Sequence, residues 1–262
     1  MGDPYCKGNC GKQDVLEHGN PLGTVIVNKL ASIPQACGTA RVRGRHFRPS
    51  PVSIESESNT RLFAHANFVT SVADPARLPR PTGAEIAFAG RSNAGKSSAI
   101  NTLVGEKRLA FVSKTPGRTQ LINYFELRNG AYLTDLPGYG YADVPPDVQR
   151  RWGMLLERYL ATREALAGLV LVMDARRPLT KLDLQMLAWF RPRRLPVHCL
   201  LTKADKLSRL EQTQTLRTTR DKLAAYGAAN TAQLFSSLKR TGIDEAESVL
   251  GSWLDGTAGN FR

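Results

Sequence analysis

Short apolar runs alternate with stretches of helical periodicity between residues 85 and 254. Each run consists mainly of consecutive hydrophobic residues without polar alternation, which is typical of a strand buried on both faces. The runs that predict strands are residues 85–89, 131–134, 169–173, 197–201 and 233–235. The stretches that predict helices follow residue 95 and cover residues 148–160, 182–190, 210–226 and 243–254. This alternation predicts an α/β fold, a mostly parallel sheet with helices on both faces.

One connection in this pattern is a tight turn. Residues 124–127 and 131–133 are separated by Arg128-Asn129-Gly130, and an Asn-Gly pair between two apolar segments predicts a hairpin. We therefore expect one antiparallel strand at the edge of the sheet.

The first 80 residues do not follow this pattern. Residues 1–60 are rich in Gly, Pro, Ser and Asn and include the basic, proline-interrupted segment 41–51. Such a composition buries too little apolar surface to offset the entropy of ordering. We expect a disordered basic extension, with an RNA-contacting arm as the alternative. Residues 61–80 are expected to form a helix or strap that packs on the main domain, residues 81–254, and residues 255–262 to form a tail.

The segment Gly90-Arg91-Ser92-Asn93-Ala94-Gly95-Lys96-Ser97 lies between a predicted strand and a predicted helix. It fits the pattern G-x-x-x-x-G-K-[ST], in which backbone N–H groups and the helix dipole face phosphate oxygens. In such a loop Lys96 can reach the β- and γ-phosphates, and the Ser97 hydroxyl can ligate Mg²⁺. The sequence therefore predicts a phosphate loop of a nucleotide-binding protein.

Three more segments each follow a predicted strand. Asp135-Leu136-Pro137-Gly138 offers an aspartate that can hold Mg²⁺ through water and an N–H that can sense a γ-phosphate. Thr202-Lys203-Ala204-Asp205 ends in a carboxylate that can accept from guanine N1–H and its exocyclic amine, while the Lys203 stem can lie over the base. Phe235-Ser236-Ser237 can offer backbone N–H groups to the guanine carbonyl. Because carboxyl ends of parallel strands meet at one crevice, the set predicts a GTP site.

Four segments, residues 85–98, 113–120, 135–141 and 202–205, share a family pattern. With them the chain resembles the EngB family of bacterial GTP-binding proteins, a branch of the TrmE-Era-EngA-EngB-Septin-like P-loop GTPases. The resemblance runs from about residue 65 to residue 254. Its most specific features are Pro116-Gly117-Arg118-Thr119-Gln120 and Leu136-Pro137-Gly138-Tyr139-Gly140.

The resemblance implies a six-stranded GTPase domain that binds GTP and GDP with Mg²⁺. It also implies roles in assembly of the large ribosomal subunit and in cell division and septation. Nucleotide contacts then fall on the segments above and on a switch segment, Gly117, Arg118, Thr119, Gln120 and Leu121. Ser97 and Thr119 become the metal ligands, and Lys96, Thr119 and Gly138 act at the γ-phosphate.

Three positions qualify this assignment. Thr202 stands where Asn is usual in GTPases, which is expected to weaken one tie to neighbouring loops. Tyr139 follows Gly138 where Ras-like enzymes place a water-orienting Gln, so we expect slow hydrolysis. Asn93 resembles the asparagine of potassium-stimulated GTPases, in which K⁺ stands in for an arginine finger. The alternative is that Asn93 only suits the backbone of the loop.

The net charge of the chain indicates the class of its binding partner. Lys and Arg total 36 against 23 Asp and Glu, a formal net charge of +13, which favours a polyanion such as nucleic acid or a ribosome. Arg176-Arg177 and residues 191–194 follow a predicted strand and helix. Contacts from these arginines to rRNA of large-subunit particles are one hypothesis, and a solvated charged face is the other.

Four cysteines are too few for a disulfide scaffold, and no apolar run is long enough to span a membrane. We expect a cytoplasmic monomer without a secretory signal or membrane association. The alternative function is a small-molecule kinase or other phosphotransferase on the same fold, which would not need a guanine-reading aspartate.

Overall fold

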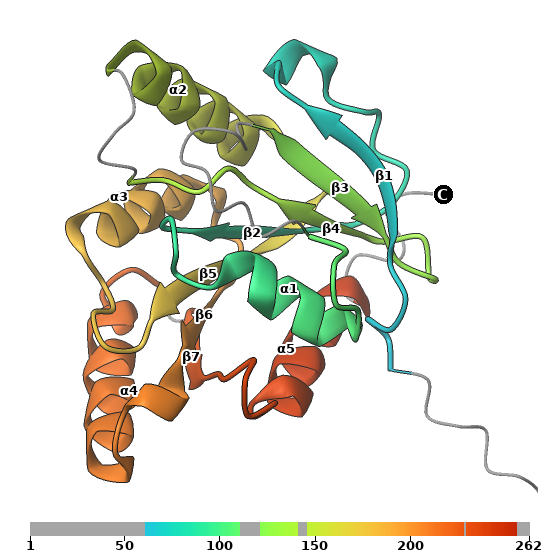
Figure 1. The fold of residues 1–262 in the computed structure, drawn as a ribbon. Helices are drawn as coiled ribbons and strands as arrows, with labels where there is room; N and C mark the ends of the chain where they lie inside the picture. Colours follow the sequence, from blue (N-terminus) through green and yellow to red (C-terminus); the bar gives the residue numbers. More distant parts are fainter. Residues whose placement is uncertain (1–60, 111–120, 141–145, 228, 256–262) are drawn as a thin grey trace, which may run out of the picture. The chain divides into compact units, whose positions relative to one another are not determined.

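The computed structural model describes residues 61–110, 121–140, 146–227 and 229–255. The predicted extension, residues 1–60, and the tail beyond Asp255 lie outside these ranges. Strands of the described part form one sheet in the order β1-β3-β4-β2-β5-β6-β7 (Figure 1). They are β1 (Asn67–Val72), β2 (Glu85–Gly90), β3 (Ile122–Glu126), β4 (Tyr132–Asp135), β5 (Leu166–Asp174), β6 (Val197–Thr202) and β7 (Thr231–Leu234).

The predicted sheet class is confirmed, but its size and edge are corrected. Neighbouring strands pair in parallel from β4 through β2, β5 and β6 to β7. The predicted hairpin joins β3 to β4 in antiparallel pairing, and Leu127 N–H donates to Ala131 O at 2.8 Å across its turn. However, β3 also pairs antiparallel with β1. The described sheet thus has seven strands rather than six, and the antiparallel strand is second from the edge.

The strand that the sequence pattern missed, β1, lies at the edge of the sheet. Of its residues only Val72 is buried, while Phe68 is 56 % exposed and Val69 is 46 % exposed. It therefore contains no buried apolar run to reveal it. Its pairing with β3 joins segments far apart in the chain, a tertiary contact that overrides local preference.

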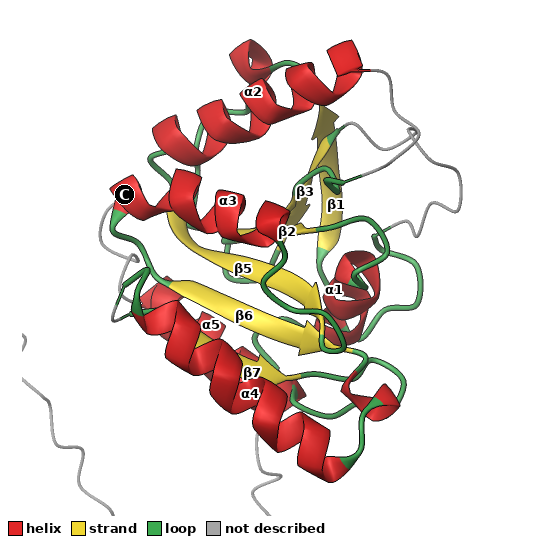
Figure 2. Cartoon of the chain, turned by 90° about the vertical axis from the view of Figure 1, so that its left-hand side faces the viewer, coloured by secondary structure: helices red, strands yellow, loops and turns green. Residues whose placement is uncertain are grey.

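Helices cover both faces of the sheet, as predicted. They are α1 (Lys96–Val104), α2 (Pro146–Thr162), α3 (Lys181–Phe190), α4 (Arg209–Ala224) and α5 (Ile243–Asp255). On one face, Ile100 of α1 and Leu250 of α5 share a buried cluster with Phe88 of β2. On the other face, α2, α3 and α4 pack over the sheet, and Figure 2 looks onto this layer.

A buried polar network closes the amino end of the central strands. Glu85, the first residue of β2, accepts hydrogen bonds from Arg163 Nε at 2.9 Å, from Arg163 Nη2, and from the Tyr159 hydroxyl at 2.9 Å. Arg163 Nη1 donates to Pro79 O at 2.7 Å. The network ties the end of α2 and the segment before β2 to the sheet.

Candidate nucleotide-binding site

The loop between β2 and α1 leaves the first turn of α1 open to a ligand. Gly95, the N-cap of α1, has φ 97° and makes no side-chain hydrogen bond to the helix. The first N–H groups of α1 thus lack a side-chain cap and carry the positive end of the helix dipole. Gly90 is also required, because a Cβ there would lie 2.7 Å from Val172 O. This geometry suits an anion at the helix N-terminus.

A buried ion pair joins α1 to the end of β4. Lys96 Nζ donates to Asp135 Oδ1, and the two side chains are 10 % and 4 % exposed. No other hydrogen bond of this ammonium lies within the described residues. Two of its three donor positions are therefore available to further oxygen atoms.

Backbone contacts hold the segment Asp135–Gly138 against the phosphate loop. Ser92 N–H donates to Tyr139 O at 2.8 Å, and Tyr139 N–H donates to Gly90 O at 3.3 Å. A Cβ on Gly138 would lie 3.5 Å from the Ser92 hydroxyl oxygen. The two predicted segments are thus brought together, as the sequence predicted.

The Thr202 hydroxyl contacts both segments that neighbour the end of β6. Its hydroxyl lies within hydrogen-bonding distance of Ala94 O in the phosphate loop and 3.0 Å from Met173 O in β5. One hydroxyl proton is shared between two carbonyl acceptors. The threonine therefore connects β6 to both neighbouring segments, and the tie expected to be weakened at this position is present.

Lys203 links the guanine segment to the phosphate loop. Its Nζ donates to Asn93 O at 2.6 Å and lies 3.0 Å from Asp174 Oδ2. Lys203 and Asn93 both have positive φ, 57° and 62°. Asparagine adopts this conformation more readily than most residues, which favours the backbone interpretation of Asn93.

Asp205 and Ser236 meet at the carboxyl ends of β6 and β7. The Ser236 hydroxyl donates to Asp205 Oδ1 at 2.5 Å and accepts from Lys239 N–H at 3.1 Å. The Asp205 side chain is 8 % exposed, with Lys206 Nζ 3.9 Å from its second oxygen. Ala204 N–H also donates to Phe235 O at 3.2 Å. The two segments are joined by both backbone and side-chain bonds.

The structure narrows the prediction for residues 235–237. Phe235 N–H donates to Leu201 O at 2.9 Å, and Ser236 N–H donates to Thr241 O at 3.1 Å. These two groups are committed to the fold, so they are poor candidates for a guanine carbonyl. Within the described part of the chain, only the Ser237 N–H of the three makes no hydrogen bond.

Tyr139 is half-buried and its hydroxyl is bound by α3. Its hydroxyl donates to Asp183 Oδ1 at 2.9 Å, and Asp183 also accepts from Thr180 N–H at 2.8 Å in the capping box of α3. Burial, with the adjacent Asp183 charge, raises the pKa of Tyr139 well above its usual value. The hydroxyl therefore stays protonated and serves as a packing contact.

The arginines proposed to contact RNA have unequal roles. Arg193 donates to Ala161 O at 2.7 Å and Arg163 O at 2.8 Å, which satisfies carbonyls at the end of α2. Arg193 thus has a structural role that neither hypothesis for these arginines included. Arg191, Arg194 and Arg177 are exposed, and Arg176 is exposed but paired with Asp174.

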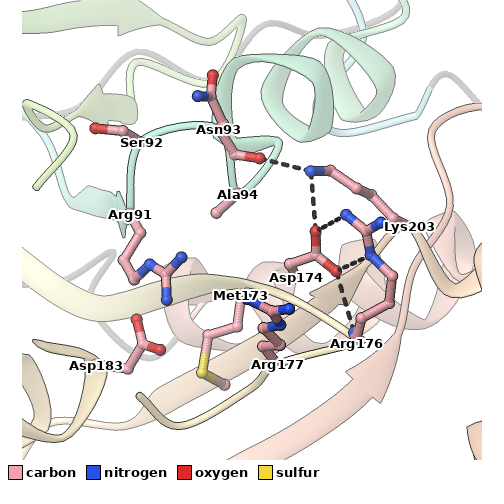
Figure 3. Close-up of a pocket in the computed structure, with 10 residues that line it drawn as sticks. All are labelled: Arg91, Ser92, Asn93, Ala94, Met173, Asp174, Arg176, Arg177, Asp183 and Lys203. Carbon is pink, nitrogen blue, oxygen red and sulfur yellow. Dashed lines mark hydrogen bonds and ion pairs between the residues drawn. The ribbon is translucent and has the colours of Figure 1, made fainter. Parts of the chain in front are cut away.

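A cavity of about 460 Å³ lies beside the phosphate loop, between β5 and Lys203 (Figure 3). Its walls include Arg91, Ser92, Asn93, Ala94, Met173, Asp174, Arg176, Arg177, Asp183 and Lys203. Figure 3 shows Asp174 between Arg176 and Lys203, with Lys203 reaching Asn93. Sequence reasoning missed Asp174 and Asp183. Asp174 directly follows an apolar run, a signal that was present in the sequence.

Several predicted site residues lie outside the described residues, namely Gly117, Arg118, Thr119 and Gln120 of the switch segment. Leu121 is described and half-buried before β3. Across the described ranges, no three His, Cys, Asp or Glu side chains are grouped to hold a metal. None of the helices in those ranges is both long and apolar enough to span a membrane.

Comparisons with known proteins agree with this geometry. A profile of the family described as "50S ribosome-binding GTPase" matches residues 85–203. A relative named "Probable GTP-binding protein EngB" from Azoarcus sp. (strain BH72) is 62% identical over 194 residues, which are 74% of this chain and 93% of the relative. A relative of the same name from Thiobacillus denitrificans is also 62% identical, over 193 residues with the same coverage.

A solved structure supports the fold. The crystal structure of a probable EngB protein aligns with a TM-score of 0.54 and 24% identity over 66% of this chain and 100% of that chain. The sequence relatives support more than the fold, because they are far more similar and are spanned almost completely. The chain belongs to the EngB family of GTP-binding proteins.

Proposed function

We propose that the protein is a GTP-binding switch with slow, Mg²⁺-dependent hydrolysis that serves large ribosomal subunit assembly. The observation that carries the proposal is the 2.6 Å hydrogen bond from Lys203 Nζ to Asn93 O. It joins the candidate guanine segment to the candidate phosphate loop. One nucleotide lying along this junction would reach the open N-terminus of α1 with its phosphates and Asp205 with its base.

At the phosphate end, the uncapped N–H groups of α1 would bind the phosphate oxygens. Lys96 would exchange its bond with Asp135 for charge-assisted bonds to the β- and γ-phosphates. Gly138, packed against Ser92, would offer its N–H to the γ-phosphate. Hydrolysis would remove this last contact, which gives the protein two states.

At the guanine end, Asp205 would select the base. Ser236 holds one carboxylate oxygen at 2.5 Å, which fixes the orientation of the group. The carboxylate would accept from N1–H and the exocyclic amine of guanine, a pair of donors that adenine lacks. The Ser237 N–H is the donor we assign to the guanine carbonyl.

The residues present fit Mg²⁺. The Ser97 hydroxyl at the start of α1 and the Asp135 carboxylate at the end of β4 are the hard oxygen donors that Mg²⁺ prefers. Few protein ligands are needed, since phosphates and waters complete its shell. The bound ion would neutralise charge that develops on the phosphates. Thr119 is the second ligand that the family resemblance implies.

The ribosomal role rests on the family. Residues 85–203 match a profile described as "50S ribosome-binding GTPase", and a net charge of +13 suits an RNA-rich partner. The same resemblance and the sequence support a part in cell division and septation, a cytoplasmic location and a monomeric state.

A role for K⁺ at Asn93 is a further proposal. Exchange of K⁺ for Na⁺ in a hydrolysis assay tests it.

The decisive experiment is a nucleotide titration. We expect GTP and GDP to bind and ATP to compete poorly. Asp205→Asn should lose about two orders of magnitude in GDP affinity and gain affinity for xanthosine nucleotides, because the asparagine matches xanthine donors and acceptors. Asp221→Asn, at an exposed position on α4, is the matched control. ATP binding as tight as GTP binding would contradict the proposal.

The ribosomal part needs its own test. Sucrose-gradient sedimentation of lysate with a GTP analogue or with GDP should place the protein on large-subunit particles in one nucleotide state only. Arg191→Gln with Arg194→Gln should weaken that binding and its salt dependence if these exposed arginines contact phosphate. Arg193 should be left unchanged, because it holds the end of α2.

A further inference from the structure

We propose that Asp174 is a positioning residue for guanine-nucleotide binding, acting through Lys203. The inference rests on the proposed function, since it concerns affinity for the same nucleotide. Asp174 ends β5 and belongs to none of the four segments that define the site. Its carboxylate nevertheless lies 3.0 Å from Lys203 Nζ.

Lys203 is held at two points. Its ammonium donates to Asn93 O at 2.6 Å and pairs with Asp174, so it connects the phosphate loop to the end of β5. A lysine side chain otherwise has several rotatable bonds to immobilise when a ligand binds. Because the ammonium is fixed at two acceptors, the Lys203 side chain is already ordered between the phosphate loop and the end of β5 before a base binds. This lowers the conformational entropy lost on binding.

Asp174 is itself held in place by Arg176. The guanidinium reaches both carboxylate oxygens, from Nε at 2.9 Å and from Nη2 at 2.6 Å, and the Arg176 N–H donates to Oδ1 at 3.1 Å. Arg176, and after it Lys203, hold the pKa of the Asp174 carboxyl well below its usual range, despite partial burial. A charged acceptor is therefore present for Lys203 at every physiological pH.

A simpler role for Asp174 is to cap its own turn, through the bond from Arg176 N–H. Asn serves that role as well as Asp does, because its side-chain oxygen accepts the same hydrogen bond. Asp174→Asn therefore removes the charge that holds Lys203 while it preserves the turn. Asp74→Asn is a matched control, since Asp74 accepts from Ala76 N–H at 2.9 Å in a similar turn far from the site in the chain.

The test is titration of the full chain with a fluorescent GDP and a fluorescent GTP analogue. Asp174→Asn should weaken both by about tenfold, the effect expected when one charge-assisted bond is lost. The unfolding midpoint of the nucleotide-free protein should stay close to that of the wild type. Asp74→Asn should bind like the wild type. Affinity of Asp174→Asn equal to that of the wild type would overturn the proposal.

A double-variant cycle shows whether Asp174 acts through Lys203. Lys203→Met should weaken binding, and the added Asp174→Asn should cause no further loss. Losses that multiply would overturn the proposal. If Asp174→Asn does not fold, Arg176→Gln, which changes an exposed side chain, should still lower nucleotide affinity two- to threefold. Unchanged affinity in Arg176→Gln would then overturn the proposal. Failure of the wild type to bind guanine nucleotides would instead overturn the proposed function.

Discussion

Two buried ion pairs stand at opposite ends of the central strands, and within the described residues they differ in how many hydrogen bonds they make. At the amino end, Arg163 and Glu85 have side chains 8 % and 2 % exposed. At the carboxyl end, Lys96 and Asp135 are buried almost as deeply, at 10 % and 4 %. Burial and charge alone do not distinguish the two pairs.

The pairs differ in how many of their donors are used. Arg163 donates through Nε and Nη2 to both oxygens of Glu85 and through Nη1 to Pro79 O, and Tyr159 adds a further bond to Glu85. Among the described residues Lys96 makes one hydrogen bond, and it stands at the start of a helix without a side-chain cap. A pair whose hydrogen-bond donors are all used stabilises the fold. A pair with unused donors beside the N-terminus of α1 is suited to bind an anion.

The largest expected effect is on the satisfied pair. Arg163→Met should reduce the free energy of unfolding by about 3–5 kcal/mol, because it leaves a buried carboxylate without its counter-ion. Urea unfolding of the nucleotide-free protein measures this. Nucleotide affinity of the folded molecules should be unchanged. Arg158→Met, at an exposed position of α2, the helix that ends just before Arg163, is the control, and an equal loss there would remove the contrast.

Lys96→Met should have the opposite profile. We expect GDP and GTP affinity to fall by about 30- to 100-fold, since charge-assisted bonds to phosphate are lost. The free energy of unfolding should also fall, because Asp135 loses its counter-ion, but by less than in Arg163→Met, because one hydrogen bond is lost instead of several. Titration and urea unfolding of the same samples separate the two effects. A stability loss as large as that of Arg163→Met would make Lys96 a structural residue too.

The same contrast explains what the sequence could predict. The phosphate loop and the parallel strands were predictable because each depends on local spacing: Gly90, Gly95 and Lys96 stand at fixed offsets between an apolar run and a helical one. The segments at Asp135 and Asp205 follow from the rule that such strands end at one edge.

What the sequence did not predict depends on contacts between distant residues. The strand β1 is recognisable only through its pairing with β3. The use of the Phe235 and Ser236 N–H groups within the fold, and the helix-end role of Arg193, likewise need the tertiary structure. Asp174 carries no motif, and its bond to Lys203 joins the ends of β5 and β6.

His198 is a buried titratable residue whose hydrogen bonds serve the fold, and it should make the stability of the protein depend on pH. It lies in β6, with Nδ1 2.7 Å from the Thr231 hydroxyl and Nε2 2.8 Å from Gln233 Oε1. Burial lowers the pKa of His198 below its usual value, with Arg220 adding to the effect and the Gln233 bond opposing it. The unfolded chain then binds the proton more readily than the folded one, so stability is fully present above about pH 6.5 and falls below it.

The measurement is the free energy of unfolding between pH 7 and pH 5. Its slope should be up to about 1.4 kcal/mol per pH unit steeper in the wild type than in His198→Gln, the limit for one proton. Nucleotide affinity, measured over the same range, should follow the same course in both proteins, because His198 lies within the sheet. Equal slopes in the two proteins would show that His198 is not buried in its neutral form.

Tyr139 tests the comparison most directly, because its hydroxyl already has a hydrogen-bond partner although the residue directly follows Gly138 of the nucleotide site. Its hydroxyl is committed to Asp183 at 2.9 Å, so it is not available to orient an attacking water. We expect slow GTP hydrolysis and no change of kcat in Tyr139→Phe. The same variant should lose about 1 kcal/mol of stability, since one partly buried hydrogen bond is removed. Single-turnover hydrolysis and urea unfolding give the two numbers. A tenfold fall in kcat with unchanged stability would place Tyr139 in the chemistry, and would show that counting satisfied donors fails inside the nucleotide site.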